Sequence, residues 1–436
     1  MPQFLDTAAP NFDSQFTALL SMKREDAPDV DDTVAAIIAD VRARGDAAVI
    51  ALTARFDRLT LTPETLRVTE DEIAEAAARV PKAERAALAL AAERIRAYHA
   101  RQMPSDESWT DESGAMLGWR WGPVDAAGLY VPGGLASYPS SVLMNAVPAR
   151  VAGVGRLVMC VPSPDGVLNP LVLLAAQLSG VDEVYRIGGA QAVAAMAYGT
   201  DTIAPVDKIT GPGNAFVAAA KRRVFGKVGI DMIAGPSEIL VIADKDNDPD
   251  WIAVDLLSQA EHDESAQSIL ITDDAAFGRA VAEAVEARLQ TLQRRAIAGP
   301  SWRDFGAIVT ARDLDEAAAL SNRLAPEHLE LAVADPDALA AKITHAGAIF
   351  LGQWTPEAVG DYVGGPNHVL PTARSARFSS GLSVMDFLKR TTLARMTPES
   401  LRAIGPAAVT LATSESLEAH GLSVQARLDR LNDAPE

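Results

Sequence analysis

The stretch that decides the fold runs from residue 238 to residue 272 and reads EILVIADKDNDPDWIAVDLLSQAEHDESAQSILIT. It opens with a short, mainly apolar run, Glu238–Ala243, and closes with a second one, Ser268–Thr272. Between them, Asp250–Glu261 is amphipathic and of helical length. Two short runs rich in β-branched residues on either side of a helix predict a strand–helix–strand unit of the kind found in parallel sheets.

The same alternation extends on both sides of this stretch, from about Val124 onward. The further strand candidates are Arg156–Val161, Glu183–Ile187, Val206–Thr210, Ala307–Val309, Leu329–Val333 and Ala348–Leu351. The further helix candidates are Pro170–Leu178, Gln191–Tyr198, Asn214–Phe225, Ala275–Arg294 and Leu314–Leu324. Alternation of this length predicts an α/β fold with mostly parallel sheets. Its two parts, before and after about Asp244, predict two sheet domains.

The flanking regions have a different pattern. A long alanine-rich stretch, Asp71–Gln102, predicts a helix that is broken or kinked at Pro81, which lacks the N–H that a helix interior needs. Met103–Gly118 is polar and rich in turn residues, so we expect a connection there. After about Phe378 the sequence is again helical, with Thr397 as the cap of a helix.

Composition limits the function. With 39 Lys and Arg against 58 Asp and Glu, the net charge of −19 repels nucleic acid and anionic lipid over most of the surface. The single cysteine, Cys160, excludes an intramolecular disulfide and a multi-cysteine metal site. The longest apolar runs, such as Leu171–Ala176, are far shorter than a membrane span, and Met1–Pro10 lacks the features of a signal peptide. We therefore expect a cytoplasmic protein.

Three glycine-rich turns follow strand candidates: Tyr130–Gly134, Gly188–Gln191 and Gly211–Asn214. Such turns bring backbone N–H groups and a helix start close to a phosphate group. None has the full dinucleotide-binding pattern, because Phe216 stands where the third glycine of the last turn is expected. An ordinary strand-to-helix turn therefore remains the simpler interpretation of each.

Two segments carry candidate metal ligands. Gln259 and His262 are three residues apart at the end of a helix candidate, so they share a face and can hold a divalent ion. A solvated helix end is the simpler alternative. Asp361 and His368 lie in the glycine-rich segment Gly360–His368, which is either a shaped site or a tight turn with polar decoration.

Glu327 and His328 are adjacent at a helix-to-strand junction. A carboxylate beside an imidazole supplies two proton-transfer groups, although a surface pair explains the sequence equally well. Taken alone, His420 near the end of the chain is a surface histidine. We assign no chemistry to His99 and His345.

Together these segments resemble the histidinol dehydrogenase family, whose members catalyse the last two steps of histidine biosynthesis. The resemblance covers nearly the whole chain. Its most specific segments are ITGPGNAFV at Ile209–Val217, GGPNHVLP at Gly364–Pro371 and RFSSGLSV at Arg377–Val384.

The resemblance implies a zinc- and NAD-dependent oxidation of L-histidinol to L-histidine through enzyme-held L-histidinal, with Glu327 and His328 as the proton-transfer pair. It implies one Zn²⁺ per subunit, held by Gln259, His262, Asp361 and His420. The implied substrate contacts are Ser237, Gln259, His262, His328, Asp361, His368, Glu415 and His420, and the implied NAD contacts are Tyr130, Gln191 and Asn214. In the implied homodimer, His420 and Glu415 reach the site of the partner subunit.

The implied fold consists of two incomplete Rossmann-like parallel-sheet domains with additional helical segments at both ends. We expect an N-terminal helical arm at residues 1–24 and a C-terminal helical dimerisation segment at 381–436. Residues 25–127 plus 240–380 are expected to form a discontinuous α/β domain with the metal and proton-transfer residues, and 128–239 an α/β domain with the NAD-contacting turns.

Three other functions stay open at this point. A paralogue could oxidise another amino or sulfonated alcohol on the same scaffold. A zinc hydrolase could use the same ligands and Glu327, but it has no use for three nucleotide-type turns. A nucleotide-binding regulator without catalysis would not need the intact pair of Glu327 and His328.

Overall fold

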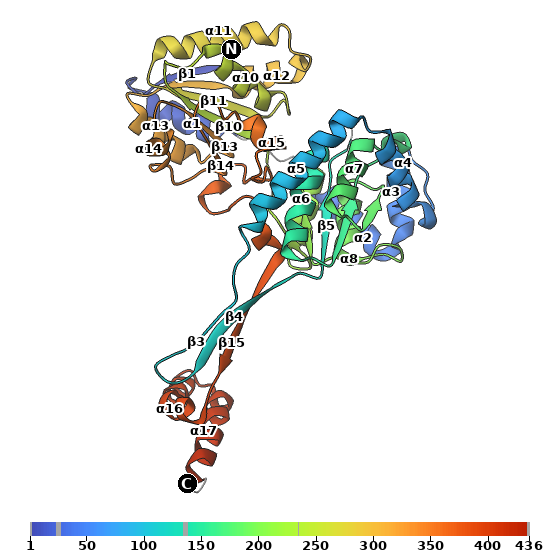
Figure 1. Cartoon of the computed structure of the whole chain (residues 1–436), viewed down its shortest axis with the longest axis vertical. Coiled ribbons are helices and arrows are strands. Elements are labelled where there is room, and N and C mark those ends of the chain that lie inside the picture. The colour runs from blue at the N-terminus through green and yellow to red at the C-terminus, as the bar shows by residue number, and fades with distance from the viewer. Residues whose placement is uncertain (1, 23–27, 134–137, 234, 434–436) are drawn as a thin grey trace. The chain divides into compact units, whose positions relative to one another are not determined.

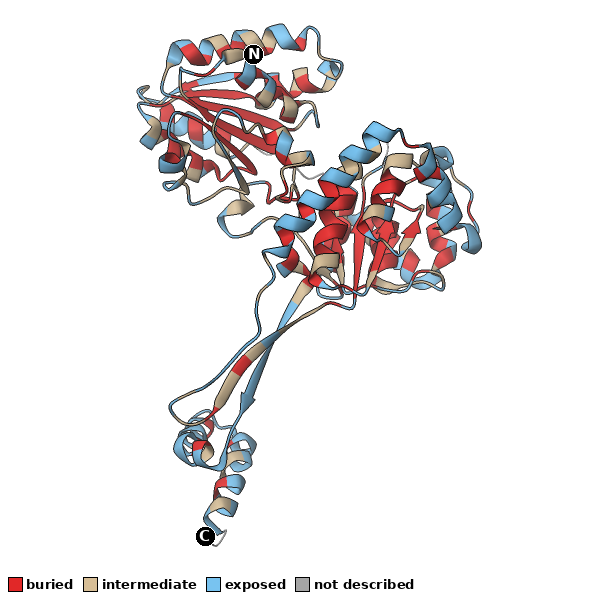
Figure 2. Cartoon of the chain, in the orientation of Figure 1, coloured by how far each residue is buried: buried red, intermediate tan, exposed pale blue. Residues whose placement is uncertain are grey.

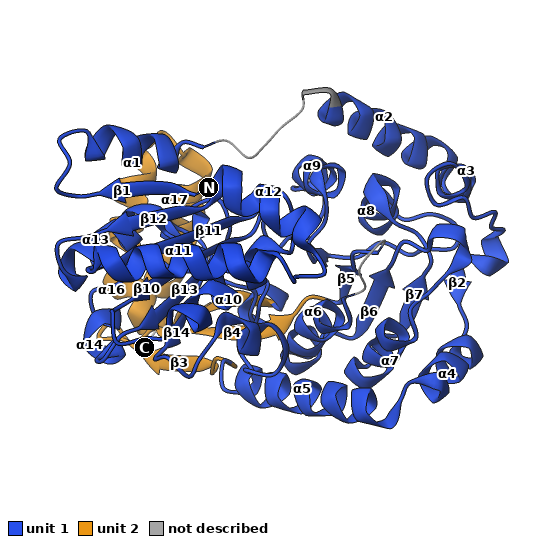
Figure 3. Ribbon diagram, turned by 90° about the horizontal axis from the view of Figure 1, so that it is seen from above, with its two compact units in different colours: residues 1–102, 125–387 blue, residues 103–124, 388–436 orange. Residues whose placement is uncertain are grey.

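The computed structural model describes residues 2–22, 28–133, 138–233 and 235–433. The chain forms two compact units, shown in blue and orange in Figure 3. Unit 1 comprises Met1–Gln102 and Asp125–Phe387, and unit 2 comprises Met103–Val124 and Leu388–Glu436. Unit 1 contains two six-stranded sheets, here called sheet A and sheet B, and unit 2 contains a three-stranded sheet.

Sheet A is entirely parallel and has the strand order β1-β12-β11-β10-β13-β14 (Figure 1). Its strands are β1 (Gln3–Asp6), β10 (Glu238–Ala243), β11 (Gln267–Thr272), β12 (Ala307–Thr310), β13 (His328–Ala332) and β14 (Ala348–Leu351). Its helices are α1 (Phe12–Leu20), α10 (Pro249–Ala260), α11 (Ala275–Leu289), α12 (Arg295–Phe305), α13 (Leu314–Leu324), α14 (Pro336–Ala340) and α15 (Glu357–Tyr362).

Side chains of sheet A alternate between two apolar layers, because successive residues of a strand point to opposite faces. On β10, Ile239 and Val241 pack with α10, α11 and α12, whereas Leu240 and Ile242 pack with α1, α13 and α14. Both faces of the central strands are therefore buried, as the red strands in Figure 2 show. Continuous apolar strands are typical of such doubly covered parallel sheets.

Sheet B has the order β2-β7-β6-β5-β8-β9, and all its pairs are parallel except β2 with β7. Its strands are β2 (Arg67–Val68), β5 (Ala126–Tyr130), β6 (Arg156–Cys160), β7 (Glu183–Tyr185), β8 (Lys208–Thr210) and β9 (Gly229–Ile230). Its helices are α2 (Pro28–Arg44), α3 (Asp46–Asp57), α4 (Glu70–Arg79), α5 (Lys82–Ala100), α6 (Pro139–Ala152), α7 (Pro170–Ser179), α8 (Gly189–Tyr198) and α9 (Ala215–Val224). One apolar cluster joins α2, α3, α8 and α9 to the sheet.

Unit 2 is an antiparallel sheet, β15-β4-β3, followed by two helices that pack together. Its strands are β3 (Glu107–Thr110), β4 (Met116–Pro123) and β15 (Leu388–Arg395), and its helices are α16 (Pro398–Ser414) and α17 (Glu418–Asp433). Short 3₁₀ turns at Pro63–Thr65, Pro164–Gly166, Ser375–Arg377 and Val384–Phe387 complete the described elements.

The expected fold class, α/β with two parallel-sheet regions, is confirmed, and so is the helix break at Pro81, which separates α4 from α5. The expectation of a mere connection at Met103–Gly118 is wrong. That segment forms β3 and the first three residues of β4, and the sheet is stabilised by the edge-to-face pair of Trp109 and Trp119 and by the pairing of β4 with β15. Strand β15, which pairs with β4, lies far along the sequence, so no local sequence pattern predicts this pairing.

Two smaller expectations also need correction. Within residues 1–24, expected as a helical arm, Gln3–Asp6 form a strand that pairs with β12, because its backbone completes the edge of sheet A; Met1, Lys23 and Arg24 lie outside the described residues. The helix expected at Ala275–Arg294 ends at Leu289 and is followed by α12.

The domain boundaries stay a prediction. The contacts, however, favour residues 28–100 as part of the domain of sheet B, and not of the expected discontinuous domain with residues 240–380. Helix α2 contacts α8 and α9, and α5 contacts α6 and α7, all of which belong to sheet B. No described helix is long and apolar enough to cross a membrane.

Candidate active site

Unit 1 contains a cavity of about 910 Å³, a size typical of small-molecule sites. Part of its lining follows the carboxyl ends of strands in sheet B, including Gly211 and Asn214 after β8. Another part comes from the amino ends of strands in sheet A, namely Ser237 before β10 and the pair of Glu327 and His328 at the start of β13. Residues that belong to different sheets therefore meet around one space.

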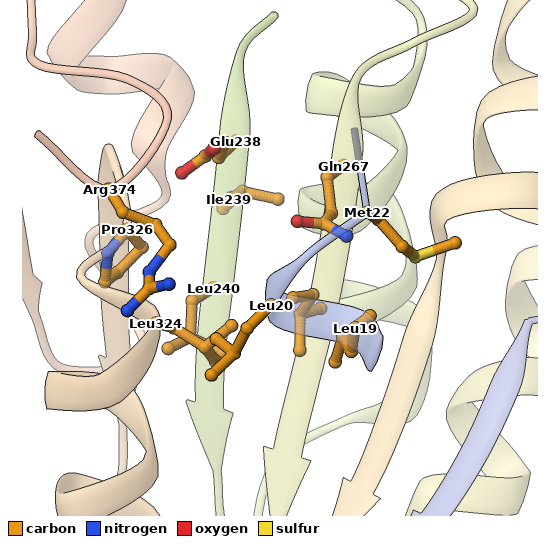
Figure 4. A pocket seen from close by; sticks show the side chains of 11 residues that line it. Leu19, Leu20, Met22, Glu238, Ile239, Leu240, Gln267, Leu324, Pro326 and Arg374 are labelled. Atoms are coloured by element: carbon orange, nitrogen blue, oxygen red, sulfur yellow. The ribbon is translucent and has the colours of Figure 1, made fainter. Parts of the chain in front are cut away.

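A second cavity, shown in Figure 4, is lined by Glu238, Arg374 and residues of α1. Its volume of about 20 Å³ has room for about one water molecule, so it cannot hold a metabolite.

Glu327 and His328 are held by one residue of the neighbouring strand. Helix α13 ends at Ala325 in the left-handed conformation, and the chain then enters β13. The backbone N–H of Glu238 donates to Oε2 of Glu327 over 2.9 Å, and the carbonyl oxygen of Glu238 lies 2.9 Å from Nδ1 of His328. Both residues are only 5% exposed. The register of β10 against β13 therefore fixes both groups.

The contacts of His328 determine which ring nitrogen is basic. A backbone carbonyl only accepts hydrogen bonds, so Nδ1 of His328 carries the proton in the neutral ring. Its Nε2 has no hydrogen-bond partner among the described residues and lies 3.5 Å from Oε1 of Glu357. Burial lowers the pKa of His328, which keeps the ring neutral near pH 7. Its Nε2 can therefore accept a proton.

Glu327 is the second potential base. Burial raises its pKa well above the ordinary value of a glutamate, and the nearby carboxylates of Glu238, Asp361 and Glu357 act in the same direction. A carboxylate with a raised pKa is a stronger base once it has lost its proton. The pair thus offers two proton acceptors, Nε2 of His328 and the carboxylate of Glu327.

Three expected metal ligands come from two helices. Gln259 lies in the last turn of α10, His262 follows that turn, and Asp361 is on α15. Nε2 of His262 is 4.0 Å from Oδ2 of Asp361. Burial alone raises the pKa of Asp361, but the hydrogen bond from His368 and the charges of nearby histidines hold it at about 2, so the group is a carboxylate.

The donor set fits a divalent metal ion. The amide oxygen of Gln259, which is only 2% exposed, has no hydrogen-bond partner among the described residues. Ligand atoms of His328, Glu357 and Asp361 also lie within 4.8 Å of one another and form a possible metal-binding group. Zinc binds nitrogen and oxygen ligands. This group offers a carboxylate, an imidazole and a buried amide oxygen without a hydrogen-bond partner, so it suits zinc.

His368 and Ser237 also line the cavity. Nδ1 of His368 lies 3.1 Å from the carbonyl oxygen of Asp361 and 3.5 Å from its Oδ1. The segment before Ser237 is tied to a neighbouring loop, because the N–H of Gly235 donates to Oγ1 of Thr372 over 2.6 Å.

Glu415 and His420 belong to unit 2. Glu415 ends α16, His420 is in α17, and both are exposed. Neither is among the described residues that line the cavity. The structure therefore brings together Ser237, Gln259, His262, Glu327, His328, Asp361 and His368 but not these two.

The glycine-rich turns of sheet B are held by side chains. The hydroxyl of Tyr130 accepts the N–H of Gly189 over 3.0 Å, which joins the first turn to the second. Asn214 caps α9 by accepting the N–H groups of Phe216 and Val217. Of the expected NAD contacts, Asn214 lines the cavity, whereas Tyr130 and Gln191 are buried and are not among its described lining residues. Gly134 of the first turn lies outside the described residues.

The third turn depends on a buried ion pair. Lys221 donates to the carbonyl oxygen of Gly211 over 2.9 Å, and Asp231 accepts the N–H of Gly211 over 2.8 Å. Lys221 and Asp231 also contact each other, with side chains 3% and 1% exposed. Gly211 has a φ of 112°, and a Cβ there would lie 2.1 Å from the carbonyl oxygen of Tyr130, so the position requires glycine.

Sequence reasoning missed three residues of this region: Glu238, Glu330 and Glu357. Glu238 contacts Glu327 and His328 through its backbone, which leaves no sequence signal. Glu330, however, interrupts the apolar strand 328–332 at a buried position. A charged residue in such a run could have been predicted from the sequence to have a structural role.

The chain is similar to known proteins over nearly its whole length. The family model described as histidinol dehydrogenase matches residues 20–428. The chain is 82% identical over 432 residues to the histidinol dehydrogenase of Ruegeria pomeroyi, covering 99% of this chain and 100% of the relative. It is 79% identical over 433 residues to that of Cereibacter sphaeroides, with 99% and 100% covered. The crystal structure of histidinol dehydrogenase from Elizabethkingia anophelis matches with a TM-score of 0.94 at 38% identity, covering 99% of both chains.

These relatives confirm the resemblance seen in the sequence. All of them bear the name histidinol dehydrogenase, so a paralogue with another alcohol substrate has no support among them, and neither has a hydrolase or a regulator. The chain belongs to the histidinol dehydrogenase family and is an NAD-dependent oxidoreductase of histidine biosynthesis.

Proposed function

We propose that this chain oxidises L-histidinol to L-histidine in two NAD-dependent steps at the cavity of unit 1, and that it holds L-histidinal between them. The observation that carries this proposal is the buried pair of Glu327 and His328, oriented by the backbone of Glu238 towards a cavity that also reaches a glycine-rich turn. Two deprotonations and one addition of water require neighbouring bases.

In the first step, Nε2 of His328 takes the hydroxyl proton of histidinol while a hydride leaves for the nicotinamide. The neutral ring with a free Nε2 supports this role. The products are the aldehyde and NADH, and the proton passes on to solvent. Keeping the aldehyde in the cavity protects a reactive intermediate from side reactions.

In the second step, Glu327 takes a proton from water as the water oxygen adds to the aldehyde carbon. His328 then removes the hydroxyl proton of the hydrate as a second hydride leaves for a second NAD. The raised pKa of Glu327 supports this role, because it makes the carboxylate a better acceptor of the water proton.

Gln259, His262, Asp361 and His420 would hold one Zn²⁺ per subunit, with one of them from the partner subunit. The ion would orient the amino and imidazole nitrogens of the substrate and polarise it. Ser237, His368 and Glu415 would contact the substrate, and Glu415 would balance its positive charge. Tyr130, Gln191 and Asn214 would contact NAD.

We also propose a homodimer in which unit 2 delivers His420 and Glu415 to the site of the partner subunit. Both residues are exposed, and so are large apolar side chains of the same unit, such as Leu411 at 62% and Leu422 at 58%. Exposed apolar surface of this kind is typical of an interface. The use of NAD and the single buried cysteine support a cytoplasmic location.

The test is to supply the purified protein with zinc, NAD and L-histidinol and to measure NADH and histidine together. The expected result is about two NADH per histidine, because each hydride reduces one NAD. One NADH with release of histidinal would contradict the second step. Absence of NADH with histidinol, together with turnover of another alcohol, would favour the paralogue.

A further inference from the structure

Glu330 is a buried carboxyl group two residues after His328. Because side chains alternate along a strand, both lie on the face of β13 that also carries Ala332 and packs with α10. Leu329 and Leu331 point to the opposite layer. Glu330 is only 3% exposed. Burying a carboxyl group is unfavourable unless hydrogen bonds compensate for the lost water, so its partners indicate its role.

The first partner of Glu330 is the start of α15. Its Oε1 accepts the backbone N–H of Glu357, the first residue of α15, over 2.5 Å. The preceding residue, Pro356, has no polar side chain with which to cap the helix. Glu330 therefore takes the place of an N-cap from a neighbouring strand, and it fixes the end of the short helix that carries Asp361.

The second neighbour of Glu330 is the carboxyl group of Asp255 on α10, which lies close enough to share a hydrogen bond with it and to shift its pKa. Two carboxyl groups can form such a bond only when they hold a proton between them. Burial raises the pKa of Glu330 well above its ordinary value and that of Asp255 to about 6, which agrees with a protonated Glu330 that donates to an ionised Asp255.

Glu330 thus joins three elements that each carry part of the site. Helix α10 carries Gln259 four residues after Asp255 and therefore on the same helical face. Helix α15 carries Asp361, and β13 carries His328. Residues that position metal ligands without touching the metal have a large influence on metal affinity.

We propose that Glu330 is a positioning residue that sets the separation of Gln259 and Asp361, the metal donors of α10 and α15, relative to His328. It touches neither substrate nor metal. The inference rests on the proposed function, since it assumes that Gln259 and Asp361 bind the ion.

The test compares Glu330→Gln with Glu330→Leu. Glutamine keeps both bonds, because its amide oxygen accepts the N–H of Glu357 and its NH₂ donates to Asp255. Leucine has a similar volume and keeps neither. We expect Glu330→Gln to bind zinc within about threefold of the wild type and Glu330→Leu to bind it roughly 10–100-fold more weakly. Competition with a chelator measures this without any assay of turnover.

A second readout separates geometry from stability. Cobalt accepts the same nitrogen and oxygen donors, and its visible absorption bands report how they are arranged. Glu330→Leu should change the cobalt spectrum, whereas Glu330→Gln should not. Glu183→Leu is the matched control, because it removes a carboxyl group from strand β7 of sheet B. It should lower stability without changing metal affinity.

Asp255→Ala is the alternative test variant if Glu330→Leu does not fold. It removes the link to α10 but leaves the cap of α15, so it should weaken zinc binding less than Glu330→Leu and should still alter the cobalt spectrum. Metal affinity and cobalt spectra equal to those of the wild type in the folded variants would overturn the inference. A wild type that binds no zinc and forms no NADH would instead overturn the proposed function.

Discussion

At the scale of the residue, the hydrogen bond between Nδ1 of His328 and the carbonyl oxygen of Glu238 leaves Nε2 as the basic atom of the ring. Glu327 is held by the N–H of the same residue, so the two bases keep a constant relation to each other. Their adjacency in sequence gives no hint of this arrangement, because consecutive residues of a strand normally point to opposite faces.

Glu327→Gln should separate the two oxidations. The amide cannot take a proton from water, so we expect the aldehyde step to slow roughly 100-fold or more, while the alcohol step changes little. Single-turnover measurements with histidinol and with histidinal give the two rates separately. Equal slowing of both steps would rule out the water-activating role.

The buried acids should make stability depend on pH. In the metal-free protein, burial raises the pKa of Glu357 to about 8, so between its ordinary pKa and about 8 the folded state holds a proton that the unfolded chain has lost. His328, whose pKa is lowered, acts in the opposite sense only below about pH 6.5. The free energy of unfolding should therefore fall as the pH rises from about 6.5 to about 8.

Urea unfolding of the metal-free protein at several pH values measures this trend. Glu357→Gln removes the titrating group and should make the curve flatter in the same range. A free energy of unfolding that rises with pH above about 6.5 would contradict the prediction.

At the scale of the element, the turn between β8 and α9 depends on a charge pair that water barely reaches. Lys221→Met leaves Asp231 buried without its cation, so we expect a loss of roughly 3–5 kcal/mol in the free energy of unfolding. The same change should raise KM for NAD more than KM for histidinol, because the turn carries Asn214.

The exposed Lys227 provides the matched control for this change. Lys227→Met should alter the free energy of unfolding by less than about 0.5 kcal/mol. Denaturant unfolding and steady-state kinetics of both variants check the prediction, and it fails if the two substitutions behave alike.

Elements are predictable from sequence where a strand is a short, continuous apolar run. Glu238–Ala243 has the bounds of β10, and Ala348–Leu351 has those of β14. The hairpin of β3 and β4 is not predicted, because its strands are largely exposed and lack a continuous apolar run, and because its remaining partner strand, β15, comes from the far end of the chain. Helix α12 contains Pro300, which obscured its pattern.

The candidate site was predictable only in part. Spacing alone leaves the pair of Gln259 and His262, and the pair of Glu327 and His328, open to ordinary explanations, and the resemblance to a family supplies their roles. The backbone of Glu238 could not be found in this way, since every residue has the same N–H and C=O groups.

At the scale of the whole molecule, the chain carries its expected site residues in two compact units, with Glu415 and His420 in unit 2. If unit 2 serves the partner subunit, heterodimers of a His420→Ala chain and a Glu327→Gln chain should contain one intact site. We expect about half of the wild-type activity per heterodimer, although each homodimer is nearly inactive.

Tagged subunits allow such heterodimers to be purified and their NADH production measured. Heterodimers of wild-type and His420→Ala chains are the control for assembly. If verified mixed heterodimers stay as inactive as the parent homodimers, each chain must use its own His420.

The two backbone hydrogen bonds from Glu238 to Glu327 and His328 have a genetic consequence. Since both bonds come from the main chain, single substitutions at position 238 other than proline preserve the donor and the acceptor. Substitutions at position 238 can therefore change the packing around Glu327 and His328 but leave the orientation of both side chains intact. Only an insertion or deletion that shifts β10 against β13 would break both hydrogen bonds at once. The register of these two strands therefore determines the orientation of Glu327 and His328.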